Sequence, residues 1–101
     1  MAVKVVRAFL ADAPGRMAQI KAATSMGDAE RLRKAAHAMK SSSANVGAKG
    51  LAATCSELEE MGRGGTIDGA TLLLSRAESE LARVLVALHA QIDESLEPAF
   101  A

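Results

Sequence analysis

Apolar side chains recur along most of this chain at alternating steps of three and four residues. Because an α-helix has about 3.6 residues per turn, these steps place the side chains in one stripe along a helix face. No segment shows the period-two alternation that predicts a half-buried strand. Such stripes are typical of helices that cross at shallow angles in a bundle. The two longest stripes are Ala29, Leu32, Ala36, Met39, Ser43 and Val46, and Ala70, Leu74, Ala77, Leu81, Val84, Leu88 and Ile92.

Helix-breaking and helix-capping residues divide this pattern into five predicted helices. Asp12 and Pro14 mark the start of a new helix, because proline is tolerated in a first turn. Asp28 is a good N-cap, Gly47 is a typical helix end, and the glycine-rich run 62–65 predicts a loop. We therefore expect an all-α fold, an antiparallel four-helix bundle preceded by a short additional N-terminal helix. The predicted single domain covers residues 1–101, with helices over about residues 2–12, 14–25, 28–45, 48–61 and 68–95.

Composition and charge narrow the classes of function. The 101 residues include 12 basic and 12 acidic side chains, two phenylalanines, and no tryptophan or tyrosine. This balance predicts neither a nucleic-acid partner nor an anionic membrane partner, and the chain has no aromatic platform for stacking bases. No apolar run approaches the roughly 18 residues that cross a bilayer. The charged residues near the N-terminus, Lys4, Arg7 and Asp12, indicate that this segment is not a signal peptide. The single cysteine fits a reducing compartment, so we expect a cytoplasmic protein without direct membrane contact.

His37 is the residue of greatest chemical interest. At 100° per residue it lies one step off the apolar stripe, so we expect its side chain at the flank of the bundle, open to solvent. Three cations, Arg33, Lys34 and Lys40, lie within one turn of it, as does Ser41. Three positive charges disfavour the imidazolium form of the ring. The sequence therefore predicts a neutral, nucleophilic imidazole beside cations that could stabilise an attached phosphoryl group.

Small residues surround this histidine on the same face. Ser41, Ala44, Gly47 and Ala48 predict a low surface above which the imidazole stands. A buried catalytic site needs walls, and this stretch supplies none. We expect a partner protein with its own pocket to close over the histidine, contacting these small residues together with Arg33 and Lys34.

The other candidate residues have simpler interpretations. His89 lies off the stripe of the last helix and has no lysine three residues later, so we expect it at the surface. Cys55 falls on an apolar stripe and is interpreted as a core residue. The acidic run Glu57, Glu59 and Glu60 is interpreted as a solvated face. Two histidines, one cysteine and scattered carboxylates do not make a zinc pattern, so we expect no metal site.

The segment HAMKSSSANVGA, residues 37–48, resembles the signature of histidine-containing phosphotransfer (Hpt) domains, roughly H-x-L-K-G-S-[SA]-x-x-x-G-A. Met39 replaces the usual leucine and Ser41 the commoner glycine. The similarity extends to FLADAPGRMAQIKAATSMGDAERLRKAAHAMK, which resembles the family's run from its first helix to its active helix, and to LEEMGR at the end of the fourth predicted helix. The residues that match the signature are His37, Lys40, Ser42, Ser43, Gly47 and Ala48.

The resemblance implies a phosphorelay carrier in two-component signal transduction. By that analogy His37 accepts a phosphoryl group from an aspartate of a response-regulator receiver domain and passes it to another receiver aspartate. Lys40 stabilises the phosphoryl group, and Ser41 could donate a hydrogen bond to it. The receiver supplies the aspartate and the Mg²⁺, so the chain needs no cofactor of its own. It would be a phosphohistidine carrier rather than a free-standing enzyme.

The sequence leaves open what surrounds the domain, whether it transfers phosphate, and its oligomeric state. The chain is either a protein by itself or a domain of a hybrid histidine kinase, whose parent protein could be membrane-anchored. A non-catalytic helical bundle that binds and regulates a partner through the same face is the competing function. We expect a monomer, since the stripes can close one core within the chain.

Overall fold

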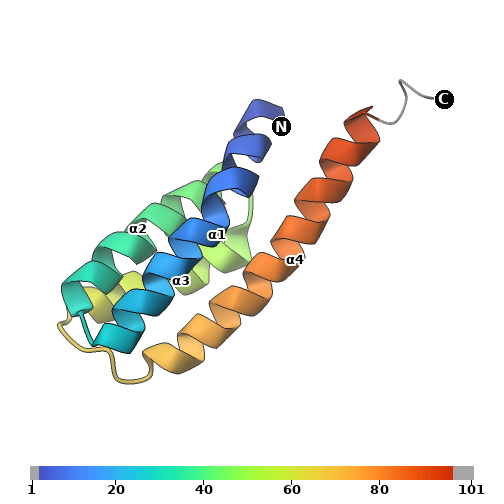
Figure 1. Cartoon of the computed structure of the whole chain (residues 1–101). Helices are drawn as coiled ribbons and strands as arrows, with labels where there is room; N and C mark the ends of the chain where they lie inside the picture. The colour runs from blue at the N-terminus through green and yellow to red at the C-terminus, as the bar shows by residue number, and fades with distance from the viewer. Residues whose placement is uncertain (1–2, 97–101) are drawn as a thin grey trace.

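The computed structural model describes residues 3–96, which form four helices: α1 (Val3–Met26), α2 (Ala29–Asn45), α3 (Lys49–Arg63) and α4 (Ala70–Leu96). Each helix runs back alongside the one before it, so that the helices form a bundle (Figure 1). α2 packs against α1 and α3, whereas α4 packs against α3 and α1. One side of α2 is therefore left uncovered, on the part of the bundle away from α4.

The prediction of separate helices over residues 2–12 and 14–25 is wrong, because α1 runs through Pro14 without a break. A proline in a helix interior removes one hydrogen bond and costs about 3 kcal/mol. The apolar stripe continues on both sides of it, through Phe9, Ala13 and Met17, which are all buried. Burial of each large apolar side chain contributes about 1.5–3 kcal/mol. Packing against α2 and α4 thus outweighs the local cost, and no additional N-terminal helix forms.

The core consists of one stripe from each helix. Ile20, Leu32, Met39, Leu51 and Leu58 are among its fully buried side chains. Alanines and Cys55 fill the positions between them, which lets the helices approach closely. None of the described helices has a stretch that is both long and apolar enough to span a membrane.

The ends of α2 are set by local sequence signals. Asp28 is the N-cap, and its side chain accepts a hydrogen bond from the backbone N–H of Arg31 at 3.0 Å, as the sequence predicts. At the other end Gly47 adopts φ of 75°, a conformation that glycine enters without steric cost, and the chain turns towards α3. These two signals fix the length of α2 and place His37 near its middle.

Gly62 lets α3 approach the first turns of α2. A Cβ atom at this position would lie 2.6 Å from the backbone oxygen of Ala29 and 2.7 Å from the backbone nitrogen of Arg33. Both distances are shorter than van der Waals contact, so only glycine fits without a shift of the backbone. The close crossing brings the residue one turn earlier on α3, Glu59, against α2.

Candidate functional site

His37 lies on the uncovered side of α2. Its side chain is 58% exposed, whereas its neighbours on the core side, Ala36 and Met39, are fully buried. The prediction of a solvent-accessible imidazole at the flank of the bundle is therefore confirmed. The histidine contributes little to the core and is open to a molecule that approaches from solvent.

Glu59 of α3 holds the inner edge of this imidazole. Its Oε2 atom lies 2.9 Å from Nδ1 of His37, although the two residues are 22 positions apart in the chain. The Glu59 side chain is only 3% exposed. The interpretation of Glu59 as part of a solvated acidic face is therefore wrong. Its neighbours do lie at the surface, where Glu57 pairs with Arg76 and Glu60 pairs with Arg63.

Two cations complete the surroundings of Glu59. The Lys40 ammonium nitrogen lies 2.5 Å from Oε1, and an Arg63 guanidinium nitrogen lies 3.1 Å from Oε2. The hydrogen bond from Lys40 is the largest influence on Glu59 and lowers the pKa of its carboxyl group; the contact with His37 lowers it further, and burial opposes both. Glu59 is consequently an ionised carboxylate near neutral pH.

This arrangement assigns different roles to the two ring nitrogens of His37. An ionised carboxylate can only accept hydrogen bonds, so in the neutral imidazole Nδ1 carries the proton and donates it towards Glu59. The lone pair is then on Nε2, at the outer end of an exposed ring. A neutral imidazole held in this way is a nucleophile with a fixed orientation.

Comparison with known proteins identifies the family. The sequence profile of the Hpt domain matches residues 4–97. The chain belongs to the Hpt family. The Hpt fold is also seen in the crystal structure of histidine-containing phosphotransfer protein B (HptB) from Pseudomonas aeruginosa PAO1, with a TM-score of 0.84 and 36% sequence identity, over 88% of this chain and 77% of that chain. No curated protein sequence matches the chain.

Membership of the Hpt family makes the chain a phosphotransfer domain of a phosphorelay. Hpt domains generally interact with receiver domains. The site fits this class of protein, since it presents one nucleophile on an open face rather than in an enclosed cavity. Its signature residues His37 and Lys40 lie together, and both contact the same carboxylate.

The other predicted site residues of this Hpt domain are spread around His37. Arg33 is bound to Glu30 at 2.6 Å. Lys34 is exposed and lines a hollow between α1 and α2. Ser41 and Ala44 are exposed along α2, whereas Gly47 and Ala48 form the turn to α3. Of the three expected cations, Lys40 contacts the buried Glu59 carboxylate that also contacts the ring, whereas Arg33 pairs with Glu30 and Lys34 lines the hollow beside α1.

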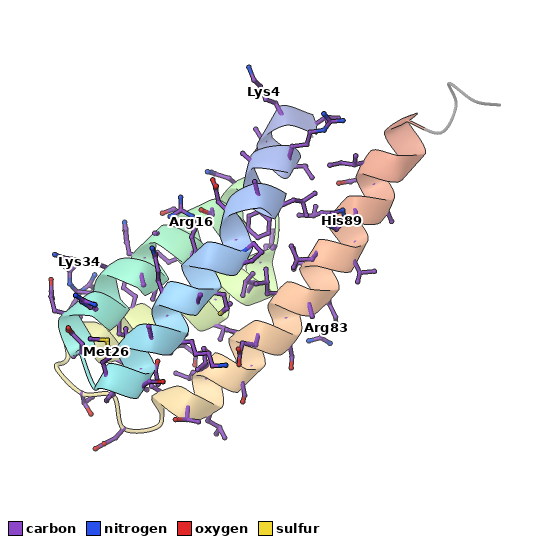
Figure 2. All side chains as sticks on the ribbon, viewed as in Figure 1. Lys4, Arg16, Met26, Lys34, Arg83 and His89 are labelled. Carbon is purple, nitrogen blue, oxygen red and sulfur yellow. The ribbon has the colours of Figure 1, made fainter. Side chains whose placement is uncertain are left out.

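Two other residues that the sequence leaves outside the site, His89 and Cys55, form no hydrogen bond or ion pair with His37 in the described part of the chain. His89 is exposed on the C-terminal half of α4, far from α2 (Figure 2). Cys55 is fully buried; burial, followed by the charge of Glu80, raises the pKa of its thiol to about 12, so it is unreactive. Within residues 3–96 the structure contains no group of histidine, cysteine and carboxylate side chains that could hold a metal ion.

Proposed function

We propose that Nε2 of His37 accepts a phosphoryl group from the aspartyl phosphate of one receiver domain and transfers it to the aspartate of another. The observation that carries this proposal is an exposed imidazole whose Nδ1 is held by the buried Glu59. A fixed Nδ1–H leaves Nε2 as the reactive nitrogen and aims it at solvent, where a receiver domain docks.

The step balances without a separate acid or base. The Nε2–P bond forms as the P–O bond to the receiver aspartate breaks, and the aspartate leaves as a carboxylate. Because Nδ1 keeps its proton, the phosphorylated ring gains positive charge, and the Glu59 carboxylate at 2.9 Å stabilises that charge. Transfer to the next receiver is the same step in reverse. Positioning and charge stabilisation supply most of the catalysis in phosphoryl transfer.

The neighbouring residues have supporting roles in this proposal. Lys40 contacts the same Glu59 carboxylate as His37 and supplies a cation that stabilises the phosphoryl oxygens. The exposed hydroxyl of Ser41 is one turn away and donates a hydrogen bond to them. The receiver brings Mg²⁺ and the aspartate. Contacts to the docked receiver come from Arg33, Lys34, Ala44, Gly47 and Ala48. We assign the domain to the cytoplasm and expect it to act as a monomer.

A phosphotransfer assay tests this function. Incubation of the protein with a phosphorylated receiver domain is expected to yield a phosphoprotein that is labile in acid and stable in alkali, as a phosphoramidate is. Mass spectrometry is expected to place the phosphate on the peptide that contains His37. Tight receiver binding without any transfer of phosphate would instead favour the alternative, a docking module that regulates its partner.

The role of Glu59 gives a second prediction. Glu59→Gln keeps the shape of the side chain but removes its charge, and is expected to slow phosphoryl acceptance about 10- to 100-fold. This range corresponds to the roughly 1.5–3 kcal/mol contributed by a hydrogen bond to a charged group. The measurement is the single-turnover rate with a phosphorylated receiver. Glu60→Gln is the matched control, because Glu60 contacts Arg63 but not His37.

The effect of Glu59→Gln on the free energy of unfolding is expected to depend on pH. The pKa of Glu59 is lowered by folding, so its contribution to stability is complete above its ordinary value of 4.5 and is lost as the pH falls through the lower folded value. The difference in stability between the parent and Glu59→Gln is therefore expected to be largest near neutral pH and to shrink below pH 4.5. Equal differences at pH 7 and pH 3 would contradict the ion pairs around Glu59.

A further inference from the structure

The surface between α1 and α2 contains two hollows. One has a volume of about 180 Å³ and is lined by residues of α1 and the C-terminal end of α2, including Arg16, Ser42 and Asn45. The other has a volume of about 350 Å³ and includes Lys34 and Ala38. Ala38 follows His37 directly, and Lys34 lies one turn before it, so a protein that covers His37 also covers the second hollow. The first hollow lies further along the same surface, beside Ser42 and Asn45 of α2.

Arg16 is partly buried in the first hollow without a partner. Its Nε atom is shielded from solvent and has no hydrogen-bond acceptor. Within the part of the chain that the structure describes, its guanidinium group forms no ion pair, not even with Asp12 one turn earlier in the same hollow. A shielded donor without an acceptor costs free energy, and most such donors in folded proteins have a partner. The hollow therefore contains one shielded donor for which the described part of the chain supplies no acceptor.

The charge of this surface identifies the kind of acceptor. Arg16 lies on α1 and Lys34 on α2, both on the side of the molecule away from α4 (Figure 2). Small side chains, Ala8 and Ser42 in the first hollow and Ala22 and Ala38 in the second, leave room for an incoming side chain. A guanidinium fork matches a carboxylate in two parallel hydrogen bonds. An acidic side chain of a partner is thus complementary to the two cations Arg16 and Lys34, whereas the Asp12 carboxylate also lines the first hollow, one turn before Arg16.

We propose that Arg16, assisted by Lys34, determines which receiver domains this protein recognises, by binding a carboxylate side chain on the receiver docked over His37. This inference rests on the proposed function, since it names a feature of the partner at the same site. Arg16 takes no part in the transfer itself. It holds an acidic residue of the receiver in the groove between α1 and α2 and so selects receivers that carry one there.

The test uses the receiver domain that phosphorylates the protein in the assay above. Arg16→Met removes the charge and keeps an unbranched chain of similar length. We expect it to weaken receiver binding about tenfold, as the loss of one charge-assisted pair predicts. The transfer rate should fall by the same factor at low receiver concentration and recover at saturation. Arg16→Lys is expected to give an intermediate loss, because it keeps the charge without the planar fork.

A matched control lies on the other side of the same helix. Lys21 lines the hollow between α1 and α4, and Lys21→Met is expected to leave the affinity for the receiver unchanged. The affinity of the parent protein should fall more steeply with added salt than that of Arg16→Met. Replacing the receiver's surface carboxylates one at a time by amides should reveal one whose effect disappears when Arg16 is already methionine.

The outcomes separate this inference from the proposed function. If the receiver labels His37 and Arg16→Met binds it within twofold of the parent, the inference about Arg16 is overturned and the phosphoryl carrier stands. If the parent protein is not labelled at all, the proposed function itself fails. A fall in affinity that accompanies a large fall in the melting temperature of Arg16→Met, with no coupled carboxylate on the receiver, would also overturn the inference.

Discussion

Replacement of His37 by glutamine is expected to abolish phosphoryl acceptance while leaving the fold intact. The amide has no nitrogen lone pair of comparable nucleophilicity, so no N–P bond can form at this position. Its N–H group can still donate to Glu59, and the position is 58% exposed. The change in the free energy of unfolding should therefore stay within about 0.5 kcal/mol, as for other surface substitutions. Labelling by a phosphorylated receiver and thermal melting are the two measurements.

His89→Gln is the control for this experiment. His89 is exposed on α4 and lies away from α2, so this variant is expected to accept phosphate at the parent rate. Retention of label by His37→Gln would move the acceptor to another residue and disprove the assignment. A loss of several kcal/mol in stability would show that His37 acts in the core, in conflict with its exposure.

The sequence predicts most of the fold because its signals are local. The three–four spacing identifies the buried stripes, and the Asp28 cap and the Gly47 turn give the ends of α2. The prediction at Pro14 is wrong because it uses the local sequence alone. A proline favours the start of a helix, but packing against the other helices keeps α1 continuous through it. The buried side chains of Phe9 and Met17 hold both halves of α1 against the bundle, and no property of the proline itself reveals this.

The site is predicted less completely, since it joins two helices. His37 and Lys40 follow from spacing on one helix and from the family resemblance. Glu59 comes from a different helix, and the charge of its side chain suggests solvent. Its position contains a usable signal: it lies four residues after Cys55 and three before Gly62, both of which are buried on α3. A carboxylate at such a position needs a partner, and His37 and Lys40 are the polar groups across the interface.

Gly62 leads to the largest expected effect on stability. Gly62→Ala would place a methyl group 2.6 Å from the Ala29 oxygen and 2.7 Å from the Arg33 nitrogen, so α2 and α3 must separate. Overpacking of this kind costs about 1–3 kcal/mol, and larger side chains should cost more. We expect the melting temperature to fall by about 4–24 °C for alanine, given about 4–8 °C per kcal/mol in a domain of this size. Phosphoryl acceptance should also slow, because the separation loosens the contact between Glu59 and His37 one turn away.

Gly15→Ala is the matched control, because a glycine in α1 is replaced in the same way but into open space. No atom lies within 4 Å of the Cβ that it would add. Alanine is favoured over glycine in a helix interior by about 0.5–1 kcal/mol, so this variant should melt higher than the parent. The same change from glycine to alanine is therefore expected to lower the melting temperature at position 62 and to raise it at position 15. If Gly62→Ala melted as high as Gly15→Ala, the close crossing of α2 and α3 would be refuted, and with it the placement of Glu59 beside His37.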